Sequence, residues 1–460
     1  MKSKTLWRIV AFLAIVAMVL SACATPAATP APATQAPATQ APATQPPATQ
    51  APATQAPATQ PPATQAPATQ APAETSAAQA PTTAPQSGQF ILGMLLVGAH
   101  NDQGWSQAHY DAGQYVEKNV ANTKMLYLEN VYSGSPSYPG QTASQLAEQL
   151  VSQGAKLIIF NSDDMKDEAL KFANAHPDIY VIGASDDWTW KDGKNYQDSP
   201  NQIDIMGKMI YGKMIAGCSA ALTSQTGKIG YLGPLINDET RRLASSAYLG
   251  AKYCWTNILK KDPAQLSFKV TWIGFWFNIP GVTSDPSQVA DDFYNSGYDV
   301  VISGIDTTEA LVEAKKMRDA GKTVWAVAYD YKTNCSVAPD ICLGVPYFNW
   351  GPAYVAAIKA AMDQTWKEAF EWNPPDWSDI NNPDTSAVGF NKGNGLSSEA
   401  STQLDGFISE LAGGLTLWKG PLNLQDKSVY LKDGETATDQ QIWYLPQLLE
   451  GMEGQSVPSS

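Results

Sequence analysis

The sequence predicts an α/β protein built from two doubly wound, Rossmann-like lobes. Short β-rich runs alternate with stretches of helical spacing along the globular part of the chain, a pattern typical of parallel sheets covered by helices. The alternation begins again after residue 201, where a second set of apolar runs follows. About 370 residues follow Phe90, more than one hydrophobic core usually holds, so we expect two lobes.

The expected elements follow from runs rich in β-branched and aromatic residues, and from segments with helical spacing between them. The predicted strands of the first lobe are residues 89–98, 124–131, 155–162 and 179–185, with helices over 106–119 and 142–154. Those of the second lobe are 228–233, 268–277, 300–304 and 324–331. We place the first lobe at 90–200 plus about 341–375, and the second at 201–335 plus about 385–450.

The first 22 residues have the features of a secretory signal peptide. Lys2, Lys4 and Arg8 flank the start of an apolar stretch that ends in small residues before Cys23. The segment LSAC resembles the lipobox of bacterial lipoproteins, in which the cysteine is lipidated and becomes the mature N-terminus. We therefore expect a lipid anchor at Cys23 on the extracytoplasmic face of the cell membrane. An ordinary signal peptide with an incidental cysteine, or an uncleaved anchor, is the alternative.

Residues 23–89 are predicted to form a disordered tether. Tandem APATQ or PPATQ pentads fill residues 31–70, with proline in every repeat and no aromatic residue. Such a segment cannot bury enough apolar surface to offset the entropy lost on ordering. Proline-rich chain rises about 3.1 Å per residue, so the tether could hold a domain on the order of 100 Å from a membrane.

The charge balance argues against nucleic acid as a partner. The formal net charge is −14, and loss of the three basic residues Lys2, Lys4 and Arg8 with the signal peptide takes it to −17. Phosphate binding needs a basic face, which this composition does not favour. After the signal peptide, no apolar run reaches the ~20 residues of a membrane span.

Four cysteines besides Cys23 suit disulfides in an exported protein. Cys335 and Cys342 bracket the short segment SVAPDI and can pair locally, which leaves Cys218 and Cys254 for each other. Free buried thiols are the alternative. Zinc is less favoured because no histidine lies near either pair, and we expect neither a metal nor a cofactor.

The segment HNDQGWSQAHYD (residues 100–111) directly follows the apolar run 91–98. A loop at the carboxyl end of a strand is where an open α/β sheet places its ligand. Carboxylates and aromatic residues recur after the predicted strands of both halves, for example at Asp163 and Asp330. We therefore expect a small-molecule ligand between the lobes.

Sequence signals for an enzyme are weak. The chain has no GxSxG, HExxH, Walker A or helix-opening GxGxxG motif. Asp163 and Asp164 are adjacent, so at a strand end they point in opposite directions. The three histidines have no partner at metal-ligand spacing. We expect no catalysis; an extracellular hydrolase that uses pairs of aspartates is the alternative from another class.

Several segments resemble the basic membrane protein (BMP) family of ABC-importer substrate-binding lipoproteins, similar to purine nucleoside receptors. They include VGAHNDQGWSQAHYDAG, GPLINDETRRLASSAYLGAKY and YDYKTNCSVAPDICLGVPYFNWGPAYV, and the resemblance runs from about residue 91 to 391. It implies a periplasmic-binding-protein type I fold that closes around a nucleoside. The implied partners are ABC permease and ATPase subunits, and we expect a monomer.

The resemblance also implies roles for residues of the first loop and the second lobe. Asp102, Trp105 and Ser106 fall on the family's stretch in which an aromatic residue stacks on the base. Trp276 falls on the aromatic residue that covers the opposite face, and Asn278 stands where the family usually has Asp. Two indoles can sandwich a purine, with stacking worth about 1–3 kcal/mol per base.

Three carboxylates complete the implied ligand site. Asp186 matches an acidic residue that reads the base edge, Asp306 matches one that holds ribose hydroxyls, and Asp330 follows the family's Gly-Tyr-Asp strand end. The family's His and Thr before Asp306 are replaced by Gly304 and Ile305. A different polar ligand, such as a sugar or an aromatic heterocycle, is therefore the alternative to a nucleoside.

Overall fold

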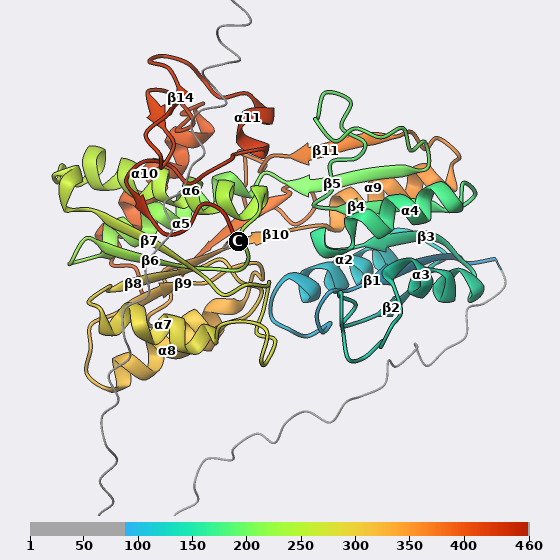
Figure 1. The fold of residues 1–460 in the computed structure, drawn as a ribbon, viewed down its shortest axis with the longest axis horizontal. Helices are drawn as coiled ribbons and strands as arrows, with labels where there is room; N and C mark the ends of the chain where they lie inside the picture. Colours follow the sequence, from blue (N-terminus) through green and yellow to red (C-terminus); the bar gives the residue numbers. More distant parts are fainter. Residues whose placement is uncertain (1–87, 459–460) are drawn as a thin grey trace, which may run out of the picture. The chain divides into compact units, whose positions relative to one another are not determined.

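The computed structural model describes residues 88–458, shown in colour in Figure 1. The predicted signal peptide, the lipidation site Cys23 and nearly all of the predicted tether lie outside these residues. The described part of the chain forms two α/β lobes, each with its own parallel sheet.

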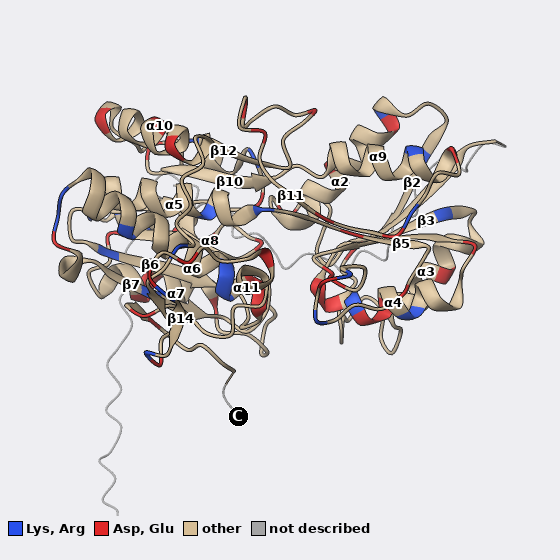
Figure 2. Ribbon diagram, turned by 90° about the horizontal axis from the view of Figure 1, so that it is seen from above, with Lys and Arg blue, Asp and Glu red and all other residues tan. Residues whose placement is uncertain are grey.

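The first lobe contains a six-stranded parallel sheet in the order β11-β5-β4-β3-β1-β2. Its strands are β1 (Phe90–Leu95), β2 (Thr123–Leu128), β3 (Ala155–Phe160), β4 (Tyr180–Ala184), β5 (Gln202–Gly207) and β11 (Ala369–Asn373). The central strands are apolar on both faces because helices cover both sides of the sheet. Those helices are α2 (Trp105–Asn119) and α9 (Gly351–Met362) above the sheet in Figure 2, and α3 (Ala143–Ser152) and α4 (Lys166–Ala175) below it.

The second lobe contains a five-stranded parallel sheet in the order β15-β7-β6-β8-β9. Its strands are β6 (Lys228–Gly233), β7 (Ser267–Trp272), β8 (Val300–Ser303), β9 (Trp325–Val327) and β15 (Met452–Glu453). The helices are α5 (Met209–Thr223), α6 (Asp238–Tyr253), α7 (Pro286–Asn295), α8 (Glu309–Asp319) and α10 (Ser398–Ala412). A separate antiparallel pair, β10 (Gly344–Phe348) and β12 (Val388–Lys392), lies beside α5.

The doubly wound fold is as predicted, but the lobe boundary differs. We expected the second lobe to begin at residue 201, whereas β5 pairs with β4 and β11 and so completes the first sheet. The boundary was missed because β5 runs almost directly into α5, so that residues 201–225 look like one helical segment. The second lobe also continues past residue 450, because β15 pairs with β7.

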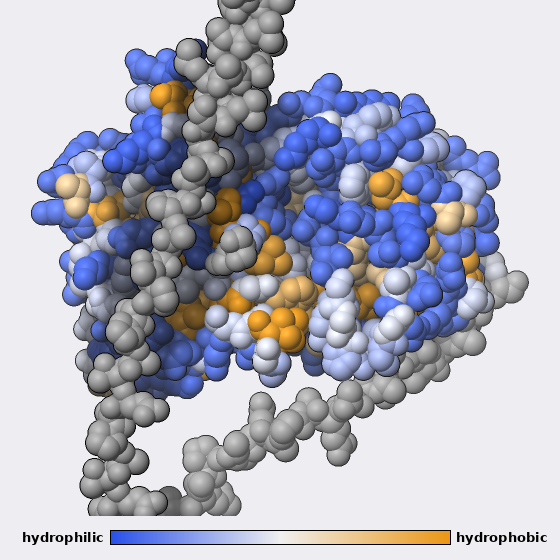
Figure 3. Space-filling model, in the orientation of Figure 1, coloured by the Kyte–Doolittle hydropathy of each residue, from blue (hydrophilic) through white to orange (hydrophobic). Residues whose placement is uncertain are grey.

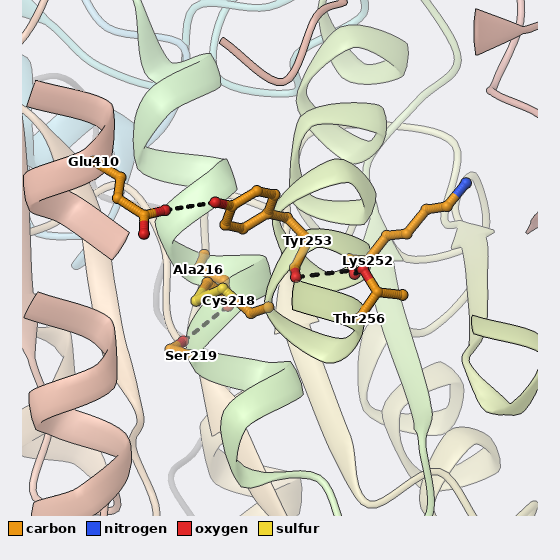
Figure 4. The surroundings of a disulfide bond; sticks show 8 residues. Ala216, Cys218, Ser219, Lys252, Tyr253, Thr256 and Glu410 are labelled. Carbon is orange, nitrogen blue, oxygen red and sulfur yellow. Dashed lines mark hydrogen bonds between the residues drawn. A yellow bond between two sulfur atoms is a disulfide. The ribbon is translucent and has the colours of Figure 1, made fainter. Parts of the chain in front are cut away.

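The core of the second lobe brings two helix backbones into direct contact. A side chain at Gly217 of α5 would lie 1.8 Å from the carbonyl oxygen of Ala247 in α6, so only glycine fits there. A disulfide between Cys218 and Cys254 joins the same two helices, with their Cα atoms 5.3 Å apart (Figure 4). Cys335 and Cys342 form a second disulfide across a short loop.

The C-terminal segment, residues 406–458, packs on the second lobe and also reaches the first (Figure 1). It contains the hairpin of β13 (Leu422–Asn423) and β14 (Val429–Leu431), and the short helix α11 (Asp439–Trp443). On its first-lobe side, the Tyr444 hydroxyl donates a hydrogen bond of 2.5 Å to Asp187. The segment therefore bridges the two lobes.

The face of the molecule shown in Figure 3 is mostly hydrophilic, with apolar residues in small patches. None of the helices within residues 88–458 has both the length and the apolar character required to cross a bilayer.

Candidate functional site

A cavity of about 380 Å³, part of it open to solvent, lies between the lobes. In each doubly wound sheet, strand order reverses beside the first strand of the lobe, at β1/β3 and at β6/β8. Loops after these strands supply Trp105, Asp163, Glu239 and Asp306 to the cavity wall. The cavity thus occupies the position where open α/β sheets bind ligands.

An indole from each lobe lines the cavity, as the sequence predicts. Trp105 begins α2, and its indole N–H donates a hydrogen bond of 2.5 Å to the carbonyl of Asn161. Trp276 lies in the loop after β7 and is half-buried. Its indole nitrogen is buried and finds no hydrogen-bond partner within the described chain. The indole of Trp105 is therefore held by a hydrogen bond within the protein, whereas the indole N–H of Trp276 remains available as a hydrogen-bond donor.

The lobes touch at the rim of the cavity. Gly104, the residue before α2, lies so close to the second lobe that a Cβ atom would stand 1.6 Å from the carbonyl oxygen of Asp306. Nearby, the amide of Asn237 donates a hydrogen bond of 3.1 Å to Asp163 across the lobe interface. The two lobes are therefore in a closed conformation around the cavity.

Asp306 and Asp330 place two carboxyl groups in the second-lobe wall. Both are buried, and neither oxygen of Asp330 has a hydrogen-bond donor among the described residues. Burial raises the pKa of each carboxyl well above its usual range. Asp330 raises the pKa of Asp306 further, while Lys213 opposes the rise at Asp330. Asp330 also has a left-handed φ of 64°, which is uncommon for a non-glycine residue and turns the chain sharply after β9.

A buried lysine that sequence reasoning missed lies beneath this wall. Lys213 of α5 is fully buried, and its ammonium group donates a hydrogen bond of 2.8 Å to the carbonyl of Ser303. The same nitrogen lies 3.0 Å from the centre of the Tyr329 ring. Burial lowers the pKa of Lys213, while Asp330 is the carboxylate that most opposes this shift. Lys213 therefore places an amine beside Asp330, below the acidic wall.

Glu239 is another cavity residue that was not predicted. It lies in the first turn of α6, whose N-terminus is closed by reciprocal hydrogen bonds between Asn237 and Thr240. Burial raises the pKa of Glu239 to about 7, and Arg242 opposes that rise. The available signal was a helix start directly after β6, since first-turn side chains of such a helix face the switch point.

Further cavity residues come from strands and strand ends of both lobes. Besides Glu239, the cavity residues outside the predicted ligand set are Ser162, Asp163, Ser185, Tyr231, Pro234, Thr240, Leu243, Gly304 and Tyr329. Of these, Ser162, Asp163 and Ser185 lie at the ends of predicted strands, the position from which the sequence predicts ligand contacts. Tyr231 and Tyr329 lie within or just after strands, where a sequence does not tell which face meets the cleft.

Two residues predicted in the first loop form hydrogen bonds within the chain. Asp102 accepts hydrogen bonds from the backbone N–H groups of Gly104, Ser106 and Gln107, at 2.8, 3.0 and 3.0 Å, and so caps α2. Burial raises its pKa to about 6, against the lowering effect of these bonds. The hydroxyl of Ser106 accepts a bond of 2.8 Å from the N–H of Gly98. Neither side chain lines the cavity.

Asp186 and Asn278 also lie outside the cavity wall. Asp186 is buried near Asp204, and burial and that neighbouring carboxylate raise its pKa well above its usual range. The Asn278 side chain is exposed and accepts a hydrogen bond of 3.1 Å from the Thr283 hydroxyl. Both residues follow strands as predicted, but their side chains point elsewhere.

The wall is suited to a ligand that donates hydrogen bonds. Asp163, Glu239, Asp306 and Asp330 all line it, and among the described residues around the cavity there is no Lys or Arg. Asp163 forms an ion pair of 3.1 Å with Lys166 at the start of α4, where Figure 2 shows acidic and basic residues intermixed. Within residues 88–458, no group of three or more His, Cys, Asp or Glu side chains is arranged to hold a metal ion.

The chain that forms this cavity is similar to proteins of a known family. The Bmp family model, described as ABC transporter substrate-binding protein PnrA-like, matches residues 91–405. A purine-binding protein of Brucella abortus is 27% identical over 359 residues, 76% of this chain and 89% of the relative. A Haloferax volcanii protein, whose name assigns it provisionally to glucose binding by an ABC transporter, is 22% identical over 302 residues, 65% and 68% of the two chains.

A solved structure supports the fold independently. A solute-binding protein of an ABC transporter system from Aeropyrum pernix K1 has a TM-score of 0.55 to this chain at 11% identity. The match covers 73% of this chain and 93% of that one. The two-lobed, type I periplasmic-binding-protein fold expected from the sequence is thus confirmed.

Proposed function

This chain belongs to the Bmp family of ABC transporter substrate-binding proteins, and on that premise we propose that it binds a purine nucleoside between its lobes. The observation that carries the proposal is the cavity wall: one indole from each lobe, and four carboxylates with no lining cation. Indoles stack on a base, while carboxylates accept hydrogen bonds from ribose hydroxyls and base N–H groups.

Each wall has a proposed role in holding the nucleoside. Trp105 and Trp276 sandwich the purine ring, and Asp306 and Asp330 accept hydrogen bonds from the ribose. The unpaired indole N–H of Trp276 donates to an acceptor on the ligand. The purine-binding relative from Brucella abortus supports this choice of ring.

The family also implies where the protein acts. Its members serve ABC transporters, so a permease and an ATPase are the implied partners of this chain. We propose that a lipid on Cys23 anchors a monomer outside the cell membrane, with residues 23–89 as the tether. Cys23→Ser should then release the protein from the membrane fraction, and unchanged membrane retention would refute the anchor.

Calorimetric titration with adenosine, guanosine and inosine tests the ligand. We expect saturable binding of at least one of them, and weaker binding of its 5′-monophosphate, because none of the residues that line the cavity is a Lys or Arg that could pair with a phosphate. Failure of all three nucleosides to bind would refute the proposal. Recovery of the bound nucleoside unchanged after incubation separates binding from hydrolysis.

Glucose is the second candidate ligand. It is favoured by the name of the Haloferax volcanii relative, and carboxylates beside aromatic rings also suit sugar hydroxyls. A sugar has no flat π-system to fill the space between two indoles, so the wall favours a nucleoside. Binding of glucose without binding of any nucleoside would reverse this choice.

A further inference from the structure

Glu239 lies where the ligand cavity meets a second hollow. That neighbouring hollow, of about 650 Å³, shares Asp163, Ser185 and Glu239 with the cavity and is also lined by Arg242 and Trp443. Trp443 belongs to the C-terminal segment, which continues beyond the residues that the family model matches. Trp443 thus lies outside the family match, yet only Arg242 and Glu239 stand between it and the ligand cavity.

Arg242 links the C-terminal segment to Glu239. Its guanidinium nitrogen is 3.9 Å from the Glu239 carboxylate, and both side chains are more than nine-tenths buried. The guanidinium lies 4.1 Å from the centre of the Trp443 ring and donates a hydrogen bond of 3.4 Å to the Trp443 carbonyl. Because Arg242 is held mainly by Trp443, the position of this ring determines how closely the cation faces the cavity.

Trp443 is in turn held by the first lobe. Its ring packs edge-on against Phe370 and Trp372 of β11, with ring centres 5.1 Å apart in each case. Arg242 and Glu239 belong to α6 of the second lobe. Trp443 therefore contacts both lobes, and it can keep both sets of contacts only while the lobes stay together.

We propose that Trp443 and Arg242 are positioning residues for Glu239: the C-terminal segment presses the guanidinium toward this cavity carboxylate when the lobes are closed. Glu239 is then kept ionised as the acceptor for an N–H of the bound purine. This role in ligand binding rests on the proposed function, whereas the effect of Trp443 on Glu239 does not.

Other charged and titratable groups also face Glu239. They come from the loop after β3, from α4, α5 and α6, and from the strands of the second lobe: Asp163, Lys166, Arg242, Lys213, Asp306, Asp330, Tyr231 and Tyr329. Among the causes of its pKa shift, Arg242 is the largest that opposes burial. Displacing Arg242 should therefore raise the pKa of Glu239, and restoring a cation should lower it again.

Titration of the ligand-free protein by carbon-13 NMR tests the link to Trp443. With glutamate labelled at the carboxyl carbon, the Glu239 signal is identified by its loss in Glu239→Gln. Trp443→Ala should move the titration midpoint upward by roughly half a pH unit or more, since loss of a close opposite charge shifts a carboxyl's pKa by about 1–3 units. Trp443→Phe, which keeps an apolar ring, should give a smaller rise and serves if the alanine variant does not fold.

A matched control lies at the far end of α6. Trp255 is also buried and has Lys261 4.0 Å from its ring centre, yet it follows a helix of 16 residues, roughly 24 Å from the Glu239 end. Trp255→Phe should leave the Glu239 midpoint unchanged. An unchanged midpoint in the Trp443 variants, or an equal rise in Trp255→Phe, overturns the proposal.

Inosine affinity at pH 6 and pH 8 tests the consequence for binding. Wild type should bind more tightly at pH 8, and Trp443→Phe should lose affinity at pH 7 by a few-fold. In the Glu239→Gln background, Trp443→Phe should change inosine affinity less than twofold; a full effect there would show that Trp443 acts by another route. Failure of inosine to bind wild type at all would count against the nucleoside, while the NMR titration would still decide the role of Trp443.

Discussion

The two indoles of the ligand cavity are held in different ways. Trp105 is 7% exposed, begins a helix, and packs edge-on against Phe348 and Trp350. Trp276 sits in an irregular loop, and its indole N–H has no partner within the described residues. The first-lobe wall is therefore part of a hydrophobic core, whereas the second-lobe wall keeps a hydrogen-bond donor that no described residue pairs with.

Because of this difference, we expect Trp105 to contribute mainly to the stability of the fold and Trp276 mainly to the affinity for the ligand. A residue packed in a core stabilises the fold whether or not a ligand is present, and its removal leaves a void. A loop residue with an unpaired donor adds little to folding and gains contacts on binding. The same substitution, tryptophan to alanine, should consequently have two different outcomes in the two lobes.

The largest effect is expected for Trp105→Ala. It removes the ring from an aromatic cluster and the hydrogen bond to Asn161, so the free energy of unfolding should fall by about 3–5 kcal/mol. Urea denaturation of the ligand-free protein measures this loss. Trp105→Phe should recover part of the stability. A fall below about 1 kcal/mol for the alanine variant would show that Trp105 is not a core residue.

Trp276→Ala should weaken nucleoside binding by about 1–3 kcal/mol through lost stacking. Its free energy of unfolding should change by less than about 1 kcal/mol, because the side chain is only half-buried. Calorimetric titration and urea denaturation of the same variant give both values. Full-strength binding would remove Trp276 from the ligand site.

Asp306→Ala should have a smaller, ligand-dependent effect. We expect ribonucleosides to lose on the order of 1–2 kcal/mol, because their hydroxyl donors are left unpaired, while the free base adenine loses much less. Asp330 raises the pKa of Asp306, and because the repulsion between two carboxylates is mutual, removing Asp306 should also lower the raised pKa of Asp330. Equal weakening of adenosine and adenine would mean that Asp306 does not face the ribose.

The fold was predictable from the sequence because the spacing of apolar residues indicates which faces of the strands and helices are buried. Strands such as β3 are apolar on both faces, and helices such as α3 show regular spacing between polar turns. The error at β5 is of another kind, because it depends on which sheet a strand joins. That choice is set by pairing with β4 and with β11, whose Ala369 pairs with Ile203, 369 − 203 = 166 residues away in the chain, and no local pattern reports it.

The candidate site was predictable only in part, because a carboxylate at the end of a strand can either cap the next helix or line the ligand cavity. Asp102 and Asp306 both follow strands, but Asp102 caps the next helix while Asp306 lines the cavity. The spacing of Asp102 to Ser106 and Gln107, at the start of a helical stretch, was a signal for the cap. Lys213 gave no signal at all, since a lysine inside a helix is normally solvated and its burial here comes from tertiary packing.

The smallest effect is expected for Asn278→Ala, two residues from Trp276. The family resemblance puts Asn278 among the ligand contacts, whereas in the closed structure its exposed side chain bonds only to Thr283. Nucleoside affinity should therefore change by less than about 0.5 kcal/mol, as for an ordinary surface substitution. Because Asn278 and Trp276 share one loop, the variant is also a control for general disturbance of that loop in Trp276→Ala. A tenfold loss of affinity in Asn278→Ala would mean that the loop rearranges on binding and brings Asn278 to the ligand. The second-lobe wall would then change its shape when the ligand binds, in addition to forming new contacts.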